Sequence, residues 1–214
     1  AVTISGARAY ALTRSTLIVV DLGVPTAPTE IGSLAGFTVG REVVAVGDLI
    51  YVLGFRSLSI VDVGIPSTPT LMGFVEWPSN VNDLEVAAGY AFVTAWENGL
   101  RVIDVTDPAL PTEVATADLG NGSQARFLDI VNDLAYVNGS GPTPVDDSLF
   151  TVALTTPTRP VLLANAVIAE GGGDVLVRDG LAHVAGGSAA LTIYDISDPL
   201  TPLWLGSIPL PSGG

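Results

Sequence analysis

The sequence contains no cysteine and no lysine, and it has a single histidine. Without cysteine the chain has no disulfide, no thiolate nucleophile and none of the usual zinc or iron–sulfur sites. Eight arginines against 22 acidic residues give a formal net charge of −14. Nucleic acid and anionic lipid surfaces bind basic patches, so we expect no nucleic-acid partner and no attraction to an anionic membrane.

Long apolar runs and helical patterns are also missing. No run approaches the roughly 18 apolar residues that cross a bilayer, so direct membrane insertion is not expected. Apolar residues nevertheless make up 48% of the 214 residues and charged residues only 14%, which excludes disorder and indicates strands buried on both faces. No stretch combines sustained helical periodicity with capping residues, so the composition favours an all-β protein.

The prolines reveal an internal repeat. Ten of the fifteen fall into pairs of the form Pro-x-x-Pro, and the pairs begin 41, 42, 49 and 42 residues apart. A fixed period of this length is typical of a repeat architecture. The five pairs are Pro25/Pro28, Pro66/Pro69, Pro108/Pro111, Pro157/Pro160 and Pro199/Pro202.

Each proline pair follows a run rich in β-branched residues, and each repeat has room for four short strands. In the third repeat we expect strands at 84–87, 90–95, 100–105 and 112–117, with the proline pair in the turn between the last two. Four strands are the content of one propeller blade. The sequence therefore predicts an all-β, single-domain β-propeller of five four-stranded blades, or alternatively a fragment or open arc of a larger propeller. The expected repeats are 1–38, 39–80, 81–123, 124–171 and 172–214.

The strand before each proline pair resembles the consensus of the LVIVD-repeat family. The matching segments are 17–21 (LIVVD), 58–62 (LSIVD) and 100–104 (LRVID). The resemblance implies a β-propeller, commonly in secreted or surface proteins of prokaryotes, and it implies no activity. We therefore expect an extracytoplasmic protein, which is periplasmic, secreted or on the cell surface. The fourth repeat departs most, with Ala153 in place of the aspartate and an insertion around 138–147.

Four aspartates recur at the end of the third strand of a repeat. They are Asp21, Asp62, Asp104 and Asp195. A carboxylate there can accept hydrogen bonds from the backbone of the following turn, so we interpret the set as structural. Copies spread over separate repeats lie too far apart to bind one ion.

A second acidic set marks the start of the first strand of several repeats, which in a propeller is the strand nearest the central channel. Its members are Glu42, Asp83 and Asp174 in one register, with Glu85 and Asp129 two residues later. Carboxylates that converge on one mouth of the channel could bind Ca²⁺. Arg41 and Arg126 lie in the adjacent register and could instead neutralise them, so a salt-bridged channel mouth remains the alternative.

The loops at one end of the repeats vary most and hold aromatic side chains beside amides. The candidate partner-binding residues there are Phe37, Trp77, Asn80, Trp96, Glu97, Asn98 and Arg126. A lectin with one site per blade would repeat its site residues, and these loops do not repeat theirs. A single asymmetric contact with a protein fits better, because loops on a rigid scaffold commonly carry function. Alternatively, the tryptophans fold back over neighbouring blades as local core.

The sequence therefore predicts a non-catalytic protein-interaction scaffold, or an accessory subunit of an extracytoplasmic assembly. A carbohydrate- or cation-binding module is the alternative. A glycosidase-like enzyme is disfavoured, because its paired carboxylates would have to come from Glu85, Asp129 or Glu97 without any local signature. The sequence sets no oligomeric state and no partner identity.

Overall fold

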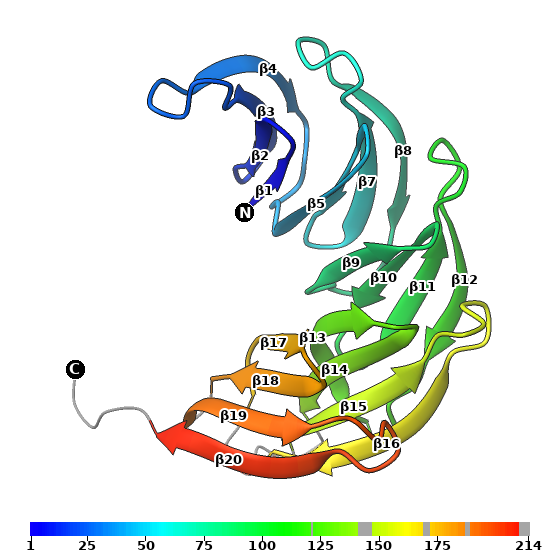
Figure 1. Ribbon diagram of the computed structural model, residues 1–214. Coiled ribbons are helices and arrows are strands. Elements are labelled where there is room, and N and C mark those ends of the chain that lie inside the picture. Colours follow the sequence, from blue (N-terminus) through cyan, green and yellow to red (C-terminus); the bar gives the residue numbers. More distant parts are fainter. Residues whose placement is uncertain (121, 141–146, 169–171, 187–188, 210–214) are drawn as a thin grey trace. The chain divides into compact units, whose positions relative to one another are not determined.

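The computed structural model describes residues 1–120, 122–140, 147–168, 172–186 and 189–209. Those residues form twenty β-strands, and no helix among them has the length and apolar character needed to cross a membrane. The strands make five four-stranded antiparallel sheets, in which each strand pairs with its neighbours in the sequence (Figure 1). The fold is thus a β-propeller with one sheet per repeat, as the sequence predicts.

The chain divides into two compact units. Unit 1 comprises Ala1–Ala91 with Ile103–Glu113, and unit 2 comprises Phe92–Val102 with Val114–Gly214. The boundary passes through the third sheet.

The first two sheets belong to unit 1. The first contains β1 (Val2–Ser5), β2 (Arg8–Leu12), β3 (Thr16–Asp21) and β4 (Thr29–Ala35). The second contains β5 (Glu42–Val46), β6 (Leu49–Leu53), β7 (Ser57–Asp62) and β8 (Thr70–Glu76). The third sheet contains β9 (Leu84–Ala87), β10 (Tyr90–Thr94), β11 (Leu100–Asp104) and β12 (Thr112–Ala117). The bounds expected for the third repeat agree with these to within one residue.

The fourth and fifth sheets belong to unit 2. The fourth contains β13 (Gln124–Val131), β14 (Leu134–Ser140), β15 (Asp147–Ala153) and β16 (Val161–Val167). The fifth contains β17 (Val175–Arg178), β18 (Leu181–Ala185), β19 (Ala189–Asp195) and β20 (Leu203–Pro209). The ends of the insertion in the fourth repeat extend β14 and β15, and residues 141–146 lie outside the described residues.

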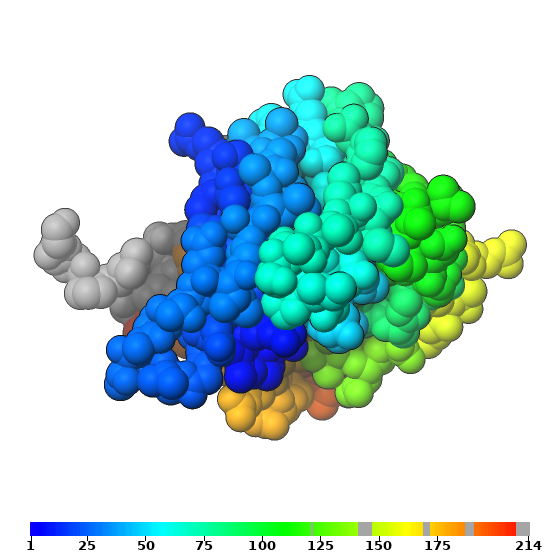
Figure 2. All heavy atoms as spheres, turned by 90° about the horizontal axis from the view of Figure 1, so that it is seen from above, coloured from blue at the N-terminus to red at the C-terminus, as the bar shows by residue number. Residues whose placement is uncertain are grey.

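Each unit has a core between the faces of adjacent sheets. In unit 1, Tyr10, Leu17 and Val19 of the first sheet pack with Ile50 and Val52 of the second. Figure 2 shows these two repeats, coloured blue to cyan, side by side. In unit 2 the corresponding cluster includes Tyr136, Leu149, Val175, Val184 and Tyr194. Alternation along each strand supplies this buried face, since successive side chains point to opposite sides of a sheet.

Two kinds of turn lie at one end of the sheets. Two-residue turns join the first and second strands, and both central residues have positive φ at Ala88 and Gly89 (50° and 81°) and at Asn132 and Asp133 (52° and 59°). Such turns match the twist of a hairpin. The turn between the third and fourth strands carries the proline pair. In all five repeats the carbonyl before the first proline accepts a hydrogen bond from the N–H three residues later, at 2.7–3.2 Å, so proline occupies the second position of a β-turn.

The proline turns also lock neighbouring sheets of unit 1 together. The turn of the second repeat packs against the backbone of β4, where a Cβ on Gly32 would overlap the carbonyl oxygen of Pro66. The turn of the third repeat packs against β8 in the same way, and a Cβ on Gly73 would lie 2.6 Å from the oxygen of Pro108. Glycine at these two positions therefore permits the close approach of one repeat to the next.

Candidate functional site

Antiparallel pairing places the variable loops at the end of the sheets opposite the proline turns. The connections from the second to the third strand, and from one sheet to the next, meet there; we call this the loop end. Phe37, Trp77 and Asn80 lie at the loop end of unit 1. Trp96, Glu97, Asn98 and Arg126 lie at the loop end of unit 2.

A cavity of about 520 Å³ opens at the loop end of unit 1. It is built by the connections from β4 to β5 and from β6 to β7, by the first residue of β7, and by the chain at the end of β8. We call it the loop-end cavity. It is lined by Thr38, Val39, Phe55, Arg56, Ser57, Glu76 and Trp77.

Trp77 forms a fixed wall of the loop-end cavity. Its indole N–H donates a hydrogen bond to a carboxylate oxygen of Glu113 at 2.7 Å, and its backbone N–H donates to the carbonyl of Arg56 at 2.8 Å. Only 7% of the residue is exposed. The sequence left two positions open for this tryptophan, a partner-binding loop or local core, and the structure agrees with the second: the side chain turns inward, and its contact with Glu113 supplies the reason.

Two guanidinium groups lie near the ring of Phe55. Arg41 is 4.9 Å and Arg56 is 5.6 Å from the centre of the Phe55 ring, both within the range of a cation–π interaction. Asparagine side chains hold both arginines: Arg41 Nη1 donates to Asn82 at 2.9 Å, and Arg56 Nε donates to Asn80 at 3.1 Å. Asn80, a candidate from the sequence, thus orients Arg56 at the rim of the cavity.

Phe37 packs inward, whereas a partner-binding residue was expected to be exposed in a loop. It is half-buried and packs against the core cluster shared by the first two sheets. Phe55 and Arg56, which line the cavity, were missed from the sequence. The run Gly54-Phe55-Arg56 between two strands was the available signal, because an aromatic residue beside a cation in a short connection has no role in the repeat.

In unit 2, Trp96 occupies a strained backbone conformation. Its φ is 51°, a value that bulky residues rarely adopt, and its backbone N–H and carbonyl both bond to Ala125, at 3.1 and 3.0 Å. The guanidinium of Arg126 lies 5.7 Å from the centre of the indole. The indole nitrogen is buried, with no hydrogen-bond partner among the described residues.

The polar neighbours of Trp96 bond within the same loop end. Gln124 donates from Nε2 to Glu97 at 2.8 Å, and Asn98 donates from Nδ2 to the carbonyl of Ala95 at 3.3 Å. The structure therefore brings Trp96, Glu97, Asn98 and Arg126 into one neighbourhood.

The acidic set at the start of the first strands bonds to backbone groups. In unit 1 both Glu42 and Asp83 accept a hydrogen bond from the N–H of Leu84, at 3.0 and 3.1 Å. Burial, together with the hydrogen bond and charge of Asp83 and the charge of Glu85, raises the pKa of Glu42 to about 9. Glu42 is therefore protonated at neutral pH and links the second sheet to the third.

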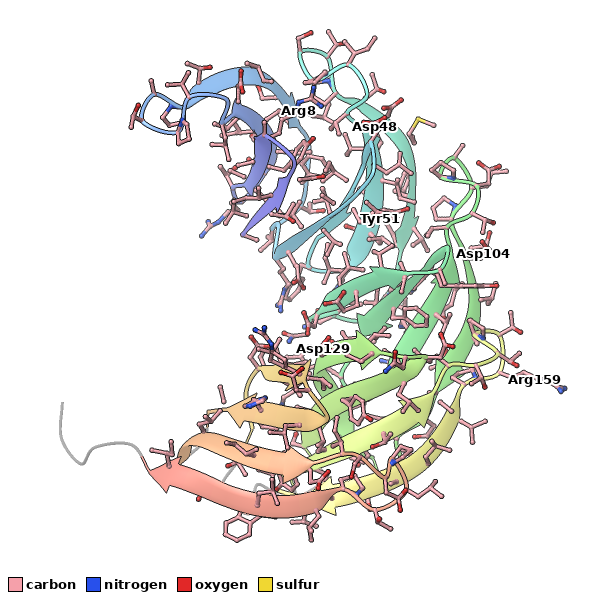
Figure 3. The ribbon with its side chains drawn as sticks, in the orientation of Figure 1. Arg8, Asp48, Tyr51, Asp104, Asp129 and Arg159 are labelled. Atoms are coloured by element: carbon pink, nitrogen blue, oxygen red, sulfur yellow. The ribbon has the colours of Figure 1, made fainter. Side chains whose placement is uncertain are left out.

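Unit 2 has the equivalent contact between sheets. Asp129 on β13 accepts a hydrogen bond from the N–H of Val177 on β17 (Figure 3), and Asp174 accepts one from the N–H of Val175 at 3.0 Å. Within the residues that the structure describes, no group of three or more His, Asp or Glu side chains is arranged to hold a metal ion. Glu42 and Asp129 act as backbone acceptors between sheets, whereas Asp83 and Asp174 accept from the N–H of the next residue.

The four recurrent aspartates each accept a backbone hydrogen bond two residues later. Asp21, Asp62, Asp104 and Asp195 bond to the N–H of Gly23, Gly64, Thr106 and Ser197 at 2.7–2.9 Å. Asp104, labelled in Figure 3, also accepts from the Thr106 hydroxyl at 2.6 Å. The Thr106 hydroxyl and N–H lower the pKa of Asp104, and bonds from Ser197 lower that of Asp195.

Solved structures with similar folds share little sequence with this chain. A protein of unknown function from Desulfotomaculum acetoxidans superposes with a TM-score of 0.79 at 10% identity, covering 98% of this chain and 69% of that one. A chain in the crystal structure of the mitotic checkpoint complex gives 0.79 at 13%, covering 99% and 64%. The WD40 domain of coronin from Toxoplasma gondii gives 0.74 at 12%, covering 95% and 56%. At these identities the likeness shows the fold alone.

A search of curated proteins finds no match. A family model, the LVIVD repeat, matches four segments of the chain, at residues 1–35, 40–76, 78–118 and 172–208. The unmatched stretch covers the fourth repeat, whose third strand lacks the aspartate and whose middle strands are extended. The four matches span most of the sequence and agree with the strand order of the sheets, and the chain therefore belongs to the LVIVD repeat family.

Proposed function

We propose that this chain is a non-catalytic propeller that binds a protein partner through its loop end, as a scaffold or accessory subunit of an extracytoplasmic assembly. The observation that carries the proposal is the loop-end cavity of unit 1. Connections and strand ends of neighbouring repeats build one concave surface with aromatic walls and a charged rim. The connections from β4 to β5 and from β6 to β7 form no part of a sheet, so their side chains are free to serve recognition.

The carboxylates support the non-catalytic part of the proposal. Asp129 accepts a backbone hydrogen bond from the adjacent sheet, and Glu97 accepts a hydrogen bond from the side-chain amide of Gln124. A glycosidase needs two carboxyl groups facing a sugar across an open site. These two side chains, both considered as glycosidase carboxylates from the sequence, are instead engaged in the structure of their own unit.

One further point favours a protein partner, and another favours a location outside the cytoplasm. One chain of similar fold comes from the mitotic checkpoint complex, an assembly of proteins by its name. The LVIVD resemblance implies secretion or surface display, and an acidic, cysteine-free chain is compatible with either.

Co-purification with a cavity variant tests the proposal. Arg56→Glu together with Phe55→Ala alters the cavity, and Ile65→Ser is the matched control, because Ile65 is 67% exposed on the proline turn at the opposite end of unit 1. We expect a protein that co-purifies with the parent and with Ile65→Ser and is lost from the cavity variant. A partner retained equally by all three chains would show that the loop end is not the binding surface.

A further inference from the structure

The loop-end cavity has two chemically distinct parts. Its wall is apolar, formed by the rings of Phe55 and Trp77 and by Val39. Its rim carries one cation and one anion, Arg56 and Glu76. A volume of about 520 Å³ is in the range that binds a compact group of drug size, so a large side chain with its adjoining backbone fits inside.

The wall is formed before any ligand binds. Glu113 fixes the indole of Trp77, and the backbone N–H groups of Trp77 and Phe55 donate to the carbonyls of Arg56 and Thr38 at 2.8 and 3.2 Å. The indole and the backbone of the wall therefore do not have to be reoriented when a partner binds, so little conformational entropy is lost on the side of this chain. An aromatic group fits these walls best, since aromatic pairs gain from edge-to-face or offset packing beyond the area that they bury.

The rim is poised to bind a carboxylate. Nε of Arg56 donates its hydrogen bond to Asn80, and the two terminal nitrogens of the exposed guanidinium face away from Asn80. Among the described residues, no carboxylate forms an ion pair with Arg56. An end-on pair of nitrogens matches the two oxygens of a carboxylate.

Glu76 restricts the class of ligand. A free anion would meet this carboxylate as well as Arg56. A peptide meets both groups favourably, because its backbone N–H donates to Glu76 while an acidic side chain accepts from Arg56. A net charge of −14 on the whole chain disfavours ligands that carry only negative charge.

We propose that the loop-end cavity binds an extended peptide segment of the partner in which an aromatic residue is adjacent to an acidic one. The aromatic ring lies between Phe55 and Trp77, and the acidic side chain pairs with Arg56. The inference rests on the proposed function, and it adds the chemistry of the partner's binding segment.

Selection from a displayed library of random dodecapeptides tests the proposal. Against the parent we expect enrichment of an aromatic residue next to Asp or Glu, and against Arg56→Glu we expect enrichment of an aromatic residue next to Lys or Arg. Synthetic peptides of the first kind should bind Arg56→Gln about tenfold or more weakly than the parent, because a hydrogen-bonded charged pair is lost. Arg14→Gln, an exposed arginine on another loop of the same end, should bind like the parent.

Several results would overturn the proposal. They are a selection that enriches no aromatic and acidic pair, peptides that bind Arg56→Gln as tightly as the parent, or binding to phosphatidylserine vesicles in place of peptides. Melting curves check that the variants are folded, and we expect folded Arg56 variants because Arg56 is exposed. A partner that still co-purifies, and is lost from the cavity variant, would preserve the proposed function while the peptide chemistry fails.

Discussion

Three glycines on the outermost strands provide the sharpest test of how the repeats lock together. Gly32, Gly73 and Gly206 occupy the same position of β4, β8 and β20. A Cβ on Gly32 or Gly73 would meet the backbone of the next proline turn, whereas within unit 2 a Cβ on Gly206 meets no described atom within 4 Å. Alanine at the three sites should therefore have opposite effects.

The magnitudes follow from the two environments. At Gly73 the new methyl group would lie 2.6 Å from a backbone oxygen and 2.8 Å from another, which is too close for either to remain in place. Such overpacking costs about 1–3 kcal/mol, because the proline turn must move away from β8. At Gly206 no described atom of unit 2 clashes with the new methyl group, so within that unit nothing opposes the gain from a stiffer unfolded chain, about 0.4–1 kcal/mol.

Urea unfolding of the three single alanine variants measures these differences. We expect lower midpoints for Gly32→Ala and Gly73→Ala and an unchanged or higher midpoint for Gly206→Ala, with similar slopes. Equal destabilisation at all three positions would refute the reasoning, since the loss would then come from the strand itself and not from the turn packed on it.

Three further predictions concern single side chains. Glu42→Gln should flatten the pH dependence of stability. The raised pKa of Glu42, about 9, gives a contribution to stability that is complete below the ordinary value of 4.5 and is lost as the pH rises towards 9. The parent should therefore lose stability from pH 5 to 8.5 relative to the variant, and equal slopes of stability against pH would contradict this. Asp104→Ala should lower the melting temperature at pH 7 and have little effect at pH 2.5, because the depressed pKa of Asp104 gives stability that is lost as the pH falls through it. Asp104→Asn, which keeps an acceptor for Thr106, is the control. Trp77→Phe should destabilise by about 1.5–3 kcal/mol in urea unfolding through loss of the bond to Glu113, and an unchanged midpoint would place the indole outside the core.

The fold could be predicted from the sequence because the repeats share the same local sequence pattern. A β-branched run and a proline pair recur five times and an aspartate four times, and each has a local structural reason. The strands of the third repeat were predicted to within one residue for that reason. The two-residue hairpin turns and the proline turns depend only on neighbouring residues, so tertiary context does not override them.

The candidate site could be predicted only in part. Trp77 and Asn80 were found, but whether Trp77 points inward depends on Glu113, which lies 36 residues away. Arg56 and Phe55 gave no repeat signal, since no other repeat has the same pair. Long-range contacts between side chains of different repeats decide the geometry of the cavity, and a sequence read on its own does not contain those distances.

The contrast between the two ends of each unit shows where variation is tolerated. At the proline end, glycine contacts, β-turn bonds and the aspartate bonds constrain the glycines, the first prolines and the aspartates, so a change at these positions costs stability first. At the loop end the connections differ in length and residue type: β2 and β3 are joined by Thr13-Arg14-Ser15, β6 and β7 by Gly54-Phe55-Arg56, and β10 and β11 by a loop that contains the strained Trp96. A non-glycine residue held at positive φ costs of the order of 1–3 kcal/mol, and packing around it must compensate. That cost falls at Trp96, where the two backbone bonds to Ala125 and the burial of the indole nitrogen supply compensating contacts at an end of the sheets whose connections otherwise vary.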